Sequence, residues 1–280
     1  MNPLFPFRQI GDFHITALSD GNMAASLDLL SGIKKSDADV IQYRAGISEP
    51  ANIHINCYLI RGPGRIILVD AGTGPLNDMA GQLNANLAAV GVSPEDVDTV
   101  LLTHCHPDHI GGLLDSEKQP VFKHAEIFLH PLEAQHWQDD EKMKIADARG
   151  QRHVERVRQT LEAYAPRVRL FNGDKIAEGI MPVWLPGHTP GHTGFRINAD
   201  ERCLLIWGDI VHYPHIQSAQ PAVSILFDTD PVQAEETRRQ IMEKAVSEKL
   251  IIAGMHLSQA GFASVHRDGS GYRIFYSEKE

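Results

Sequence analysis

Residues 104–109 gather four side chains that can bind metal: His104, His106, Asp108 and His109. The apolar run 97–102 comes directly before them and predicts a buried strand that ends at this cluster. In α/β enzymes, the loops at the carboxyl ends of strands commonly carry the chemistry. Four such residues packed together cost stability unless something neutralises them. The segment therefore predicts a metal site on a loop of an α/β protein.

The order of residues within the cluster suggests two ions. In an extended loop His104 and His106 project to the same side and can hold one ion as a pair. Asp108 and His109 lie beyond Pro107, which bends the chain and leaves them free to face a second ion. The intervening Cys105 is expected to be a small buried hydrophobe.

Three more candidates, His188, Asp209 and His256, each follow an apolar run that reads as a strand. His188 stands in a loop rich in glycine and proline and is expected to complete a three-histidine set with His104 and His106. The strand before Asp209 is too apolar to tolerate a carboxylate that is neither paired nor coordinated, and its two oxygens can bridge two cations. We expect these strand ends to converge on one place.

Other residues are assigned supporting roles. Asp70 ends the predicted strand 66–69 and is expected to orient His104 or His106 through the second ring nitrogen, although it can also cap a turn. For His192, a hydrogen bond to a ligand and a role within its own loop are both open. The remaining histidines are predicted to be structural: His14, His54, His124, His130, His136, His153, His212, His215 and His266.

The pattern along the chain predicts one layered α/β domain over residues 1–280. Predicted strands cover 13–18, 53–60, 65–69, 125–129, 182–185, 195–198, 203–207 and 250–253, followed by a closing hairpin at 263–266 and 272–276. Predicted helices cover 76–90 and 233–248, the second capped by Asp230 and Pro231. A helical insertion over 131–167, interrupted around Gly150, is expected to cover the active face. Trp137 lies on it and is a candidate for the substrate pocket, with helix packing as the alternative.

Composition limits the partners. The formal charge of −10 argues against nucleic acid and anionic membranes, so a small molecule is expected. The sequence shows no signal peptide pattern and no apolar run of about 18 residues. Its 3 cysteines are widely spaced, which favours a reducing cytoplasm over a disulfide framework. A homodimer is left open.

These motifs resemble those of the metallo-β-lactamase-fold hydrolases, whose signature His-x-His-x-Asp-His matches residues 104–109. The resemblance also includes segments 68–72 and 186–189, the Gly208-Asp209 corner and His256, and it covers nearly the whole chain. It implies a four-layered αβ/βα sandwich of two similar halves. It further implies one metal held by His104, His106 and His188, a second held by Asp108, His109 and His256, and Asp209 as the bridge between them.

Within the superfamily, the segments 11–21, 187–193 and 255–258 look most like the methyl parathion hydrolase group, which neighbours the N-acyl homoserine lactone lactonases. True β-lactamases generally lack the bridging aspartate, glyoxalase II enzymes carry a C-terminal helical region, and RNase Z-like nucleases carry an RNA-binding arm or basic surface. The lactonases place a tyrosine shortly after the bridging aspartate. Here that neighbourhood reads Ile210-Val211-His212-Tyr213, and Tyr213 is retained as a candidate pocket residue.

The resulting expectation is a hydrolase of lactones or related esters with organophosphate triester hydrolysis as a side activity. Two divalent ions, zinc first and manganese, cobalt or iron as alternatives, would share a hydroxide nucleophile. Asp209 would hold the metal pair and Asp108 would move the proton. The alternatives are a phosphotriesterase as the main activity, a glyoxalase II-like thioesterase and a non-catalytic metal-binding sensor. The physiological substrate is open.

Overall fold

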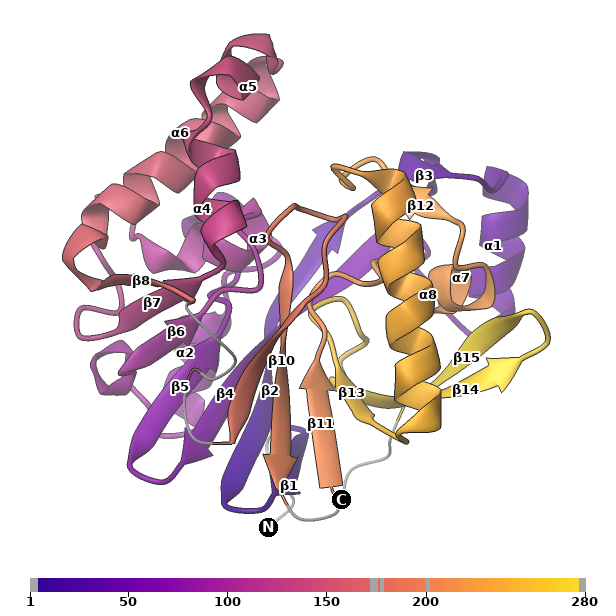
Figure 1. Cartoon of the computed structure of the whole chain (residues 1–280), viewed down its shortest axis with the longest axis horizontal. Coiled ribbons are helices and arrows are strands. Elements are labelled where there is room, and N and C mark those ends of the chain that lie inside the picture. The colour runs from indigo at the N-terminus through magenta and orange to yellow at the C-terminus, as the bar shows by residue number, and fades with distance from the viewer. Residues whose placement is uncertain (1–4, 172–175, 177–178, 200–201, 277–280) are drawn as a thin grey trace.

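The computed structural model describes residues 5–171, 176, 179–199 and 202–276 and shows two facing β-sheets with helices on their outer sides (Figure 1). The first sheet has the order β1 (Phe7–Ile10), β2 (Phe13–Ala24), β4 (Asn52–Gly62), β5 (Arg65–Val69), β6 (Thr99–Leu101), β7 (Glu126–Leu129) and β8 (Val168–Leu170). The second has the order β15 (Gly271–Tyr276), β14 (Phe262–Asp268), β13 (Ile251–Ala253), β11 (Arg202–Ile206), β10 (Thr193–Ala199) and β9 (Ile180–Trp184). A short pair joins β3 (Leu30–Ser31) to β12 (Ser224–Ile225).

The helices of the described residues are α1 (Lys35–Arg44), α2 (Leu83–Ala89), α3 (Pro107–Ile110), α4 (Pro131–Gln138), α5 (Asp140–Ile145), α6 (Ala148–Ala163), α7 (Pro214–Ala219) and α8 (Pro231–Ser247). Helices α2 and α6 pack with the first sheet in one apolar cluster, and α8 packs on the second sheet in another. A third cluster fills the space between the sheets. The four-layered αβ/βα prediction is therefore confirmed. None of the described helices is both long and apolar enough to cross a membrane.

Alternation along the strands builds these layers, because successive side chains of a strand point to opposite faces. In β5, Ile67 and Val69 enter the core between the sheets, whereas Leu68 packs outward toward α2. In β11, Leu204 and Ile206 point inward and Leu205 packs outward toward α8. Strands covered on both faces need continuous apolar runs, and these are the runs that the sequence shows.

Parallel pairing places the ends of key strands at one edge of the sandwich. β5 pairs in parallel with β6, with Val69 opposite Leu101, and β11 pairs in parallel with β13, with Ile206 opposite Ala253. The loop that follows each of these strands therefore emerges at the same edge of its sheet. Asp70, Asp209 and the segments that start at residues 103 and 254 all lie on such loops.

Several predicted elements are confirmed, including the hairpin of β4 and β5, the closing hairpin of β14 and β15, and the cap of α8. The side chain of Asp230 accepts a hydrogen bond of 3.0 Å from the Gln233 N–H, as the sequence predicted. β1, α1 and α7 were not predicted. The helix α1 is largely exposed, so its sequence lacks a clear apolar stripe.

Two predicted helix boundaries were wrong. The helix expected at 76–90 begins only at Leu83, because the Asp20 carboxylate accepts hydrogen bonds from the Gly81 and Leu83 N–H groups and holds the preceding residues in a loop. The helical cover is interrupted at Asp139 and Asp147, whose side chains cap α5 and α6, and not at Gly150, which lies inside α6.

The same Asp20 carboxylate packs closely against Gly72, and this contact can be tested by its effect on stability. Gly72 has φ +68°, and a Cβ atom there would lie 2.4 Å from Asp20 Cγ. We expect Gly72→Ala to lower the free energy of unfolding by about 3 kcal/mol, combining left-handed backbone strain with overpacking. The matched control is Gly64→Ala, which has φ +70° and open space around the Cβ position. It should cost only about 1 kcal/mol. Urea-induced unfolding measures both, and equal losses would contradict the packing argument.

Candidate metal centre

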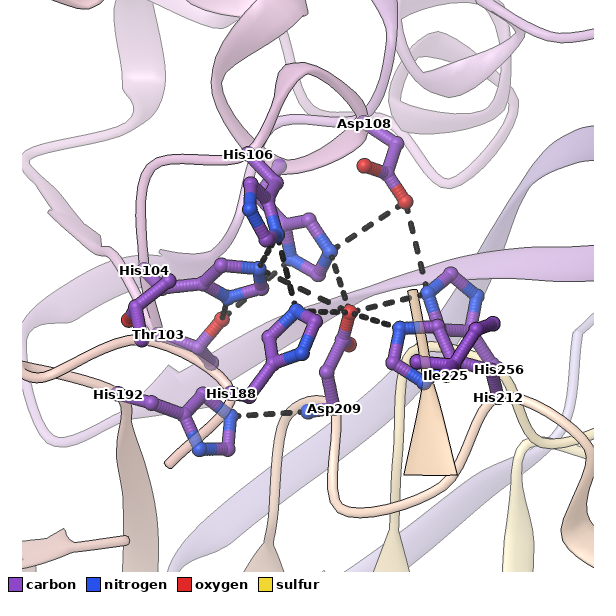
Figure 2. A network of polar contacts seen from close by, with 12 residues as sticks. Thr103, His104, His106, Asp108, His188, His192, Asp209, His212, Ile225 and His256 are labelled. Atoms are coloured by element: carbon purple, nitrogen blue, oxygen red, sulfur yellow. Dashed lines mark hydrogen bonds and ion pairs between the residues drawn. The ribbon is translucent and has the colours of Figure 1, made fainter. Parts of the chain in front are cut away.

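The loops at the sandwich edge bring all seven predicted ligands together, and all of them except His109 are labelled in Figure 2. One group comprises His104, His106 and His188, and a second comprises Asp108, His109, Asp209 and His256; within each group the ligand atoms lie within 4.8 Å of one another. Both sheets contribute, since four of the seven residues follow β6 of the first sheet, whereas His188, Asp209 and His256 follow β9, β11 and β13 of the second. Strand ends far apart in sequence thus form one cluster.

Three ring nitrogens face one another in the first group. His106 Nδ1 lies 2.9 Å from His104 Nε2 and 2.9 Å from His188 Nε2. Burial lowers the pKa of His104 and of His106 well below the ordinary value, so these two rings are neutral and can offer a lone pair. Imidazole nitrogens arranged in this way are typical of zinc and other transition-metal ligands.

The second group surrounds one oxygen of Asp209. Asp209 Oδ2 lies 3.3 Å from His109 Nε2 and 3.1 Å from His256 Nε2, and Asp108 Oδ2 lies 3.4 and 3.5 Å from the same two nitrogens. The same oxygen is also 3.7 Å from His104 Nε2 and 3.4 Å from His188 Nε2. Asp209 therefore lies between the two groups, where its bridging role was expected.

Hydrogen bonds on the far side of the rings determine which nitrogen faces the centre. His109 Nδ1 lies 2.6 Å from Asp70 Oδ2, and His188 Nδ1 lies 2.9 Å from Asp228 Oδ1. His256 Nδ1 lies 2.9 Å from its backbone acceptor, the His54 carbonyl. In a neutral ring the N–H must point to these acceptors, so each Nε2 directs a lone pair at Asp209. Lone pairs facing a carboxylate require positive charge between them.

The electrostatics agree that the centre requires cations. Burial lowers the pKa of His188, yet the facing Asp209 and Asp228 raise it more, to a net value of about 9. In addition, His109 Nε2 and Asp209 Oδ1 are buried with no hydrogen-bond partner among the described residues. Buried polar atoms are normally satisfied. The ligand atoms present therefore fit metal ions, which would satisfy the orphaned His109 Nε2 and replace the protons that now compensate Asp209.

Asp70 occupies a different place from the predicted one. It bonds to His109 and not to His104 or His106, and it also accepts from the Thr103 N–H at 2.8 Å and the Thr103 hydroxyl at 2.7 Å. The prediction failed because His106 turns its Nδ1 toward the cluster and His104 Nδ1 lies 3.0 Å from the Thr103 hydroxyl. Asp70 has φ 57°, a conformation that aspartate tolerates better than most residues.

His192 supports the backbone of the bridging residue. Its Nδ1 donates to the Leu185 carbonyl at 2.8 Å, and its Nε2 accepts from the Asp209 N–H at 2.9 Å. Burial lowers the pKa of His192 to about 3, so the ring stays neutral and can accept this bond. Gly208 is required beside it, because a Cβ atom there would lie 2.3 Å from His192 Nε2.

His212 belongs to the centre, contrary to the structural role predicted for it. It is 2% exposed, its Nε2 lies 3.2 Å from Asp209 Oδ2, and its ring stacks on that of His256 with centroids 4.9 Å apart. Burial lowers its pKa to about 4. The position three residues after Asp209 was the available signal. The Tyr213 hydroxyl instead donates a hydrogen bond of 2.6 Å to the Ala25 carbonyl.

Glu133 is a second residue that sequence reasoning missed. Its fully buried carboxylate accepts from the Cys105 N–H at 2.9 Å, the Thr189 hydroxyl at 2.6 Å and the Trp137 indole N–H at 2.6 Å. Trp137 thus lies behind the cluster, 7% exposed, with its ring centroid 5.9 Å from that of His106. Trp137 also contacts His153, with ring centroids 4.4 Å apart, so any influence of Trp137 on substrates would pass through His106 or His153, which both line a cavity at the centre.

Two cavities reach the centre. The entrance cavity, about 520 Å³, has His106, Asp108, Asp209 and His212 at its base and α6 along one wall. The other cavity, about 480 Å³, is called the rear cavity; it shares His212 with the first and is lined by mostly polar residues. Neither cavity has Trp137 in its lining, whereas Tyr213 lines the rear one.

Comparison with curated proteins gives partial matches. The uncharacterized protein YobT of Bacillus subtilis is 28% identical over 152 residues, which cover 52% of this chain and 58% of that protein. A probable metallo-hydrolase of Mycobacterium bovis is 28% identical over 171 residues, which cover 54% of this chain and 49% of the relative. The aligned part thus spans about half the length of these relatives.

Solved structures match over almost the full length. The hydrolase AbOPH of the beta lactamase superfamily has a TM-score of 0.92 at 28% identity, covering 99% of this chain and 98% of its own. AidC, a dizinc quorum-quenching lactonase solved with the product N-hexnoyl-L-homoserine, has a TM-score of 0.92 at 24% identity with the same coverage. The profile of the metallo-beta-lactamase superfamily matches residues 52–256, which include every candidate ligand. The chain therefore belongs to the metallo-beta-lactamase superfamily.

Proposed function

We propose that the protein is a dinuclear metal-dependent hydrolase of lactones or related esters, with phosphotriester hydrolysis as a side activity. The observation that carries this proposal is the position of Asp209 Oδ2, which lies within 3.1 to 3.7 Å of histidine nitrogens from both ligand groups. A single carboxylate oxygen shared in this way suits two neighbouring cations. AidC, a dizinc lactonase, and AbOPH, a hydrolase, have the same fold.

Bound metal ions would supply Lewis acidity and lower the pKa of water toward about 7. The residues of the chain have separate tasks. Asp209 fixes the ligand groups relative to each other, held by the hydrogen bond from its N–H to His192. Asp108 is the more exposed of the two carboxylates, 8% against 3%, and it lines the entrance cavity, so it is placed to accept and return a proton.

His212 is the candidate for binding the substrate oxygen. It lines both cavities, and its Nε2 lies 3.2 Å from Asp209 Oδ2, the oxygen around which the ligand groups gather. A ring that is neutral at pH 7 carries one N–H, which in the absence of metal donates from Nε2 to Asp209 Oδ2. Once metal ions compensate the charge of Asp209, the same N–H can instead donate to a carbonyl or to the leaving oxygen of a substrate. Tyr213, the predicted pocket residue of this segment, instead uses its hydroxyl to bind the Ala25 carbonyl.

The first test of the proposal is metal dependence. We expect about two equivalents of divalent metal per chain, and loss of activity on chelation, since two ligand groups are present. Protein loaded separately with Zn²⁺, Mn²⁺ or Co²⁺ should be assayed on 4-nitrophenyl acetate, a simple lactone and paraoxon, with elemental analysis of each sample. One tightly held ion with full turnover would contradict the dinuclear assignment. Turnover of none of the three would favour a metal-binding protein without catalysis.

The bridging residue is tested by Asp209→Asn, which keeps the shape and removes the charge. We expect a decrease in kcat of at least about 10²-fold and weaker retention of one metal, because a preorganised charge is lost. The control is Asp115→Asn, which alters an exposed loop carboxylate outside the centre. If Asp209→Asn kept two metals and near-native rates on every ester, the bridging role would be wrong.

The role of His212 is tested by His212→Phe. We expect kcat to fall by at least about tenfold while the metal content stays within measurement error, because the substrate hydrogen bond is lost and the ligands His188 and His256 remain. The control His215→Phe alters a residue that lines only the rear cavity. Metal loss in the His212 variant would instead identify this ring as a ligand, in keeping with its grouping with His188 and Asp209.

A further inference from the structure

The entrance cavity is lined by both cationic and apolar side chains. Three arginines of α6, Arg149, Arg152 and Arg156, line it at spacings of three and four residues, which place them on one face of the helix. The cavity also contains the apolar side chains of Leu226 and Phe227. The guanidinium of Arg149 lies 5.6 Å from the centroid of the Phe227 ring, so the cationic wall and the apolar wall meet.

The three arginines lack acidic partners. Within the described residues no ion pair joins Arg149, Arg152 or Arg156 to a carboxylate, whereas Arg158 on the same helix pairs with Asp140 at 2.8 Å. The one acidic side chain at this rim, Asp147, caps α6 through a 2.7 Å bond from the Gly150 N–H. The cationic charge on this wall is therefore available to a ligand.

The charge of the rest of the molecule makes this wall distinctive. The chain carries a formal charge of −10, so a general attraction for anions is not expected. The carboxylates at the base of the cavity, Asp108 and Asp209, face the centre where metal ions are proposed to bind, and those ions would compensate their charge. A ligand in the entrance cavity would then meet net positive charge at its rim.

On the basis of the proposed hydrolase function, we infer that the substrates are esters or lactones with an anionic group, a carboxylate or a phosphate, at the end of an apolar chain. The apolar part would pack on Leu226 and Phe227, and the anion would bind the arginines. A guanidinium matches the paired oxygens of both kinds of anion. A wholly neutral ester would leave these charges without a partner.

The test compares two esters with the same leaving group, mono-4-nitrophenyl adipate and its methyl ester. We expect kcat/KM to favour the anionic ester by at least about tenfold at low salt, and the preference to shrink as NaCl is added. A third ester, 4-nitrophenyl 5-phosphonopentanoate, has the same chain length and separates a preference for carboxylate from one for phosphate-type anions. Equal kcat/KM for the neutral and both anionic esters would overturn the inference.

The residues are tested by the double variant Arg152→Gln/Arg156→Gln, which spares the Arg149 contact with Phe227. We expect the ratio of anionic to neutral kcat/KM to fall by at least about fivefold. The matched control, Arg239→Gln/Lys244→Gln, removes two exposed charges from α8 outside the cavity and should leave the ratio unchanged. If the ratio of anionic to neutral kcat/KM fell equally in both double variants, the preference would depend on the overall charge of the protein. That result would overturn the assignment of the anion site to the α6 arginines.

Calorimetric binding of the 4-nitroanilide of adipic acid, compared with its methyl ester, separates this inference from the proposed function. If no ester is hydrolysed but the anionic anilide binds and the double variant loses that binding, the hydrolase proposal fails and the anion site stands. If esters are hydrolysed and the two anilides bind equally, the hydrolase proposal stands and the anion site fails.

Discussion

A carboxylate buried at the end of an apolar strand is the constraint on which the rest of this structure depends. Asp209 is 3% exposed and follows β11, whose side chains fill two cores. Burial raises the pKa of Asp209, but His109, His256 and the other facing imidazoles hold it well below its ordinary value. An ionised group in such a place is tolerated only with compensating charge around it. The converging histidines therefore stabilise the ionised Asp209 carboxylate, in addition to forming a set of candidate metal ligands.

The loops that deliver these histidines are fixed to each other by a second buried carboxylate. Glu133 bonds to the Cys105 N–H, between His104 and His106, and to the Thr189 hydroxyl, next to His188. One loop follows a strand of the first sheet and the other a strand of the second, so Glu133 sets the distance between loops that no strand pairing connects. The helical cover, which supplies Glu133, thus contributes to the geometry of the centre as well as covering it.

The sequence predicted the features that depend on local patterns. Apolar runs ending in histidine or aspartate identified the strands and their ends, and the seven candidate ligands lie on the loops that follow those ends. Asp70, Asp228 and Glu133 illustrate what local patterns do not encode. The partner of Asp70 depends on which ring nitrogen of His106 faces inward. Asp228 and Glu133 act on residues 40 and 56 positions away, and no periodicity in the sequence signals such contacts.

His212 is a case in which the sequence was only partly informative. The sequence shows that His212 lies three residues after Asp209, but it does not show which way the side chain points. Consecutive residues in the loop diverge: His212 turns to the centre, while Tyr213 turns to the Ala25 carbonyl. The α6 arginines differ again, because helical spacing places them together but only the tertiary structure shows that their common face borders a cavity. Residues of the candidate centre are bound into buried networks, whereas no ion pair joins these three arginines to a carboxylate in the described part of the chain, so substitutions on this face of α6 would leave the contacts of the candidate ligands intact.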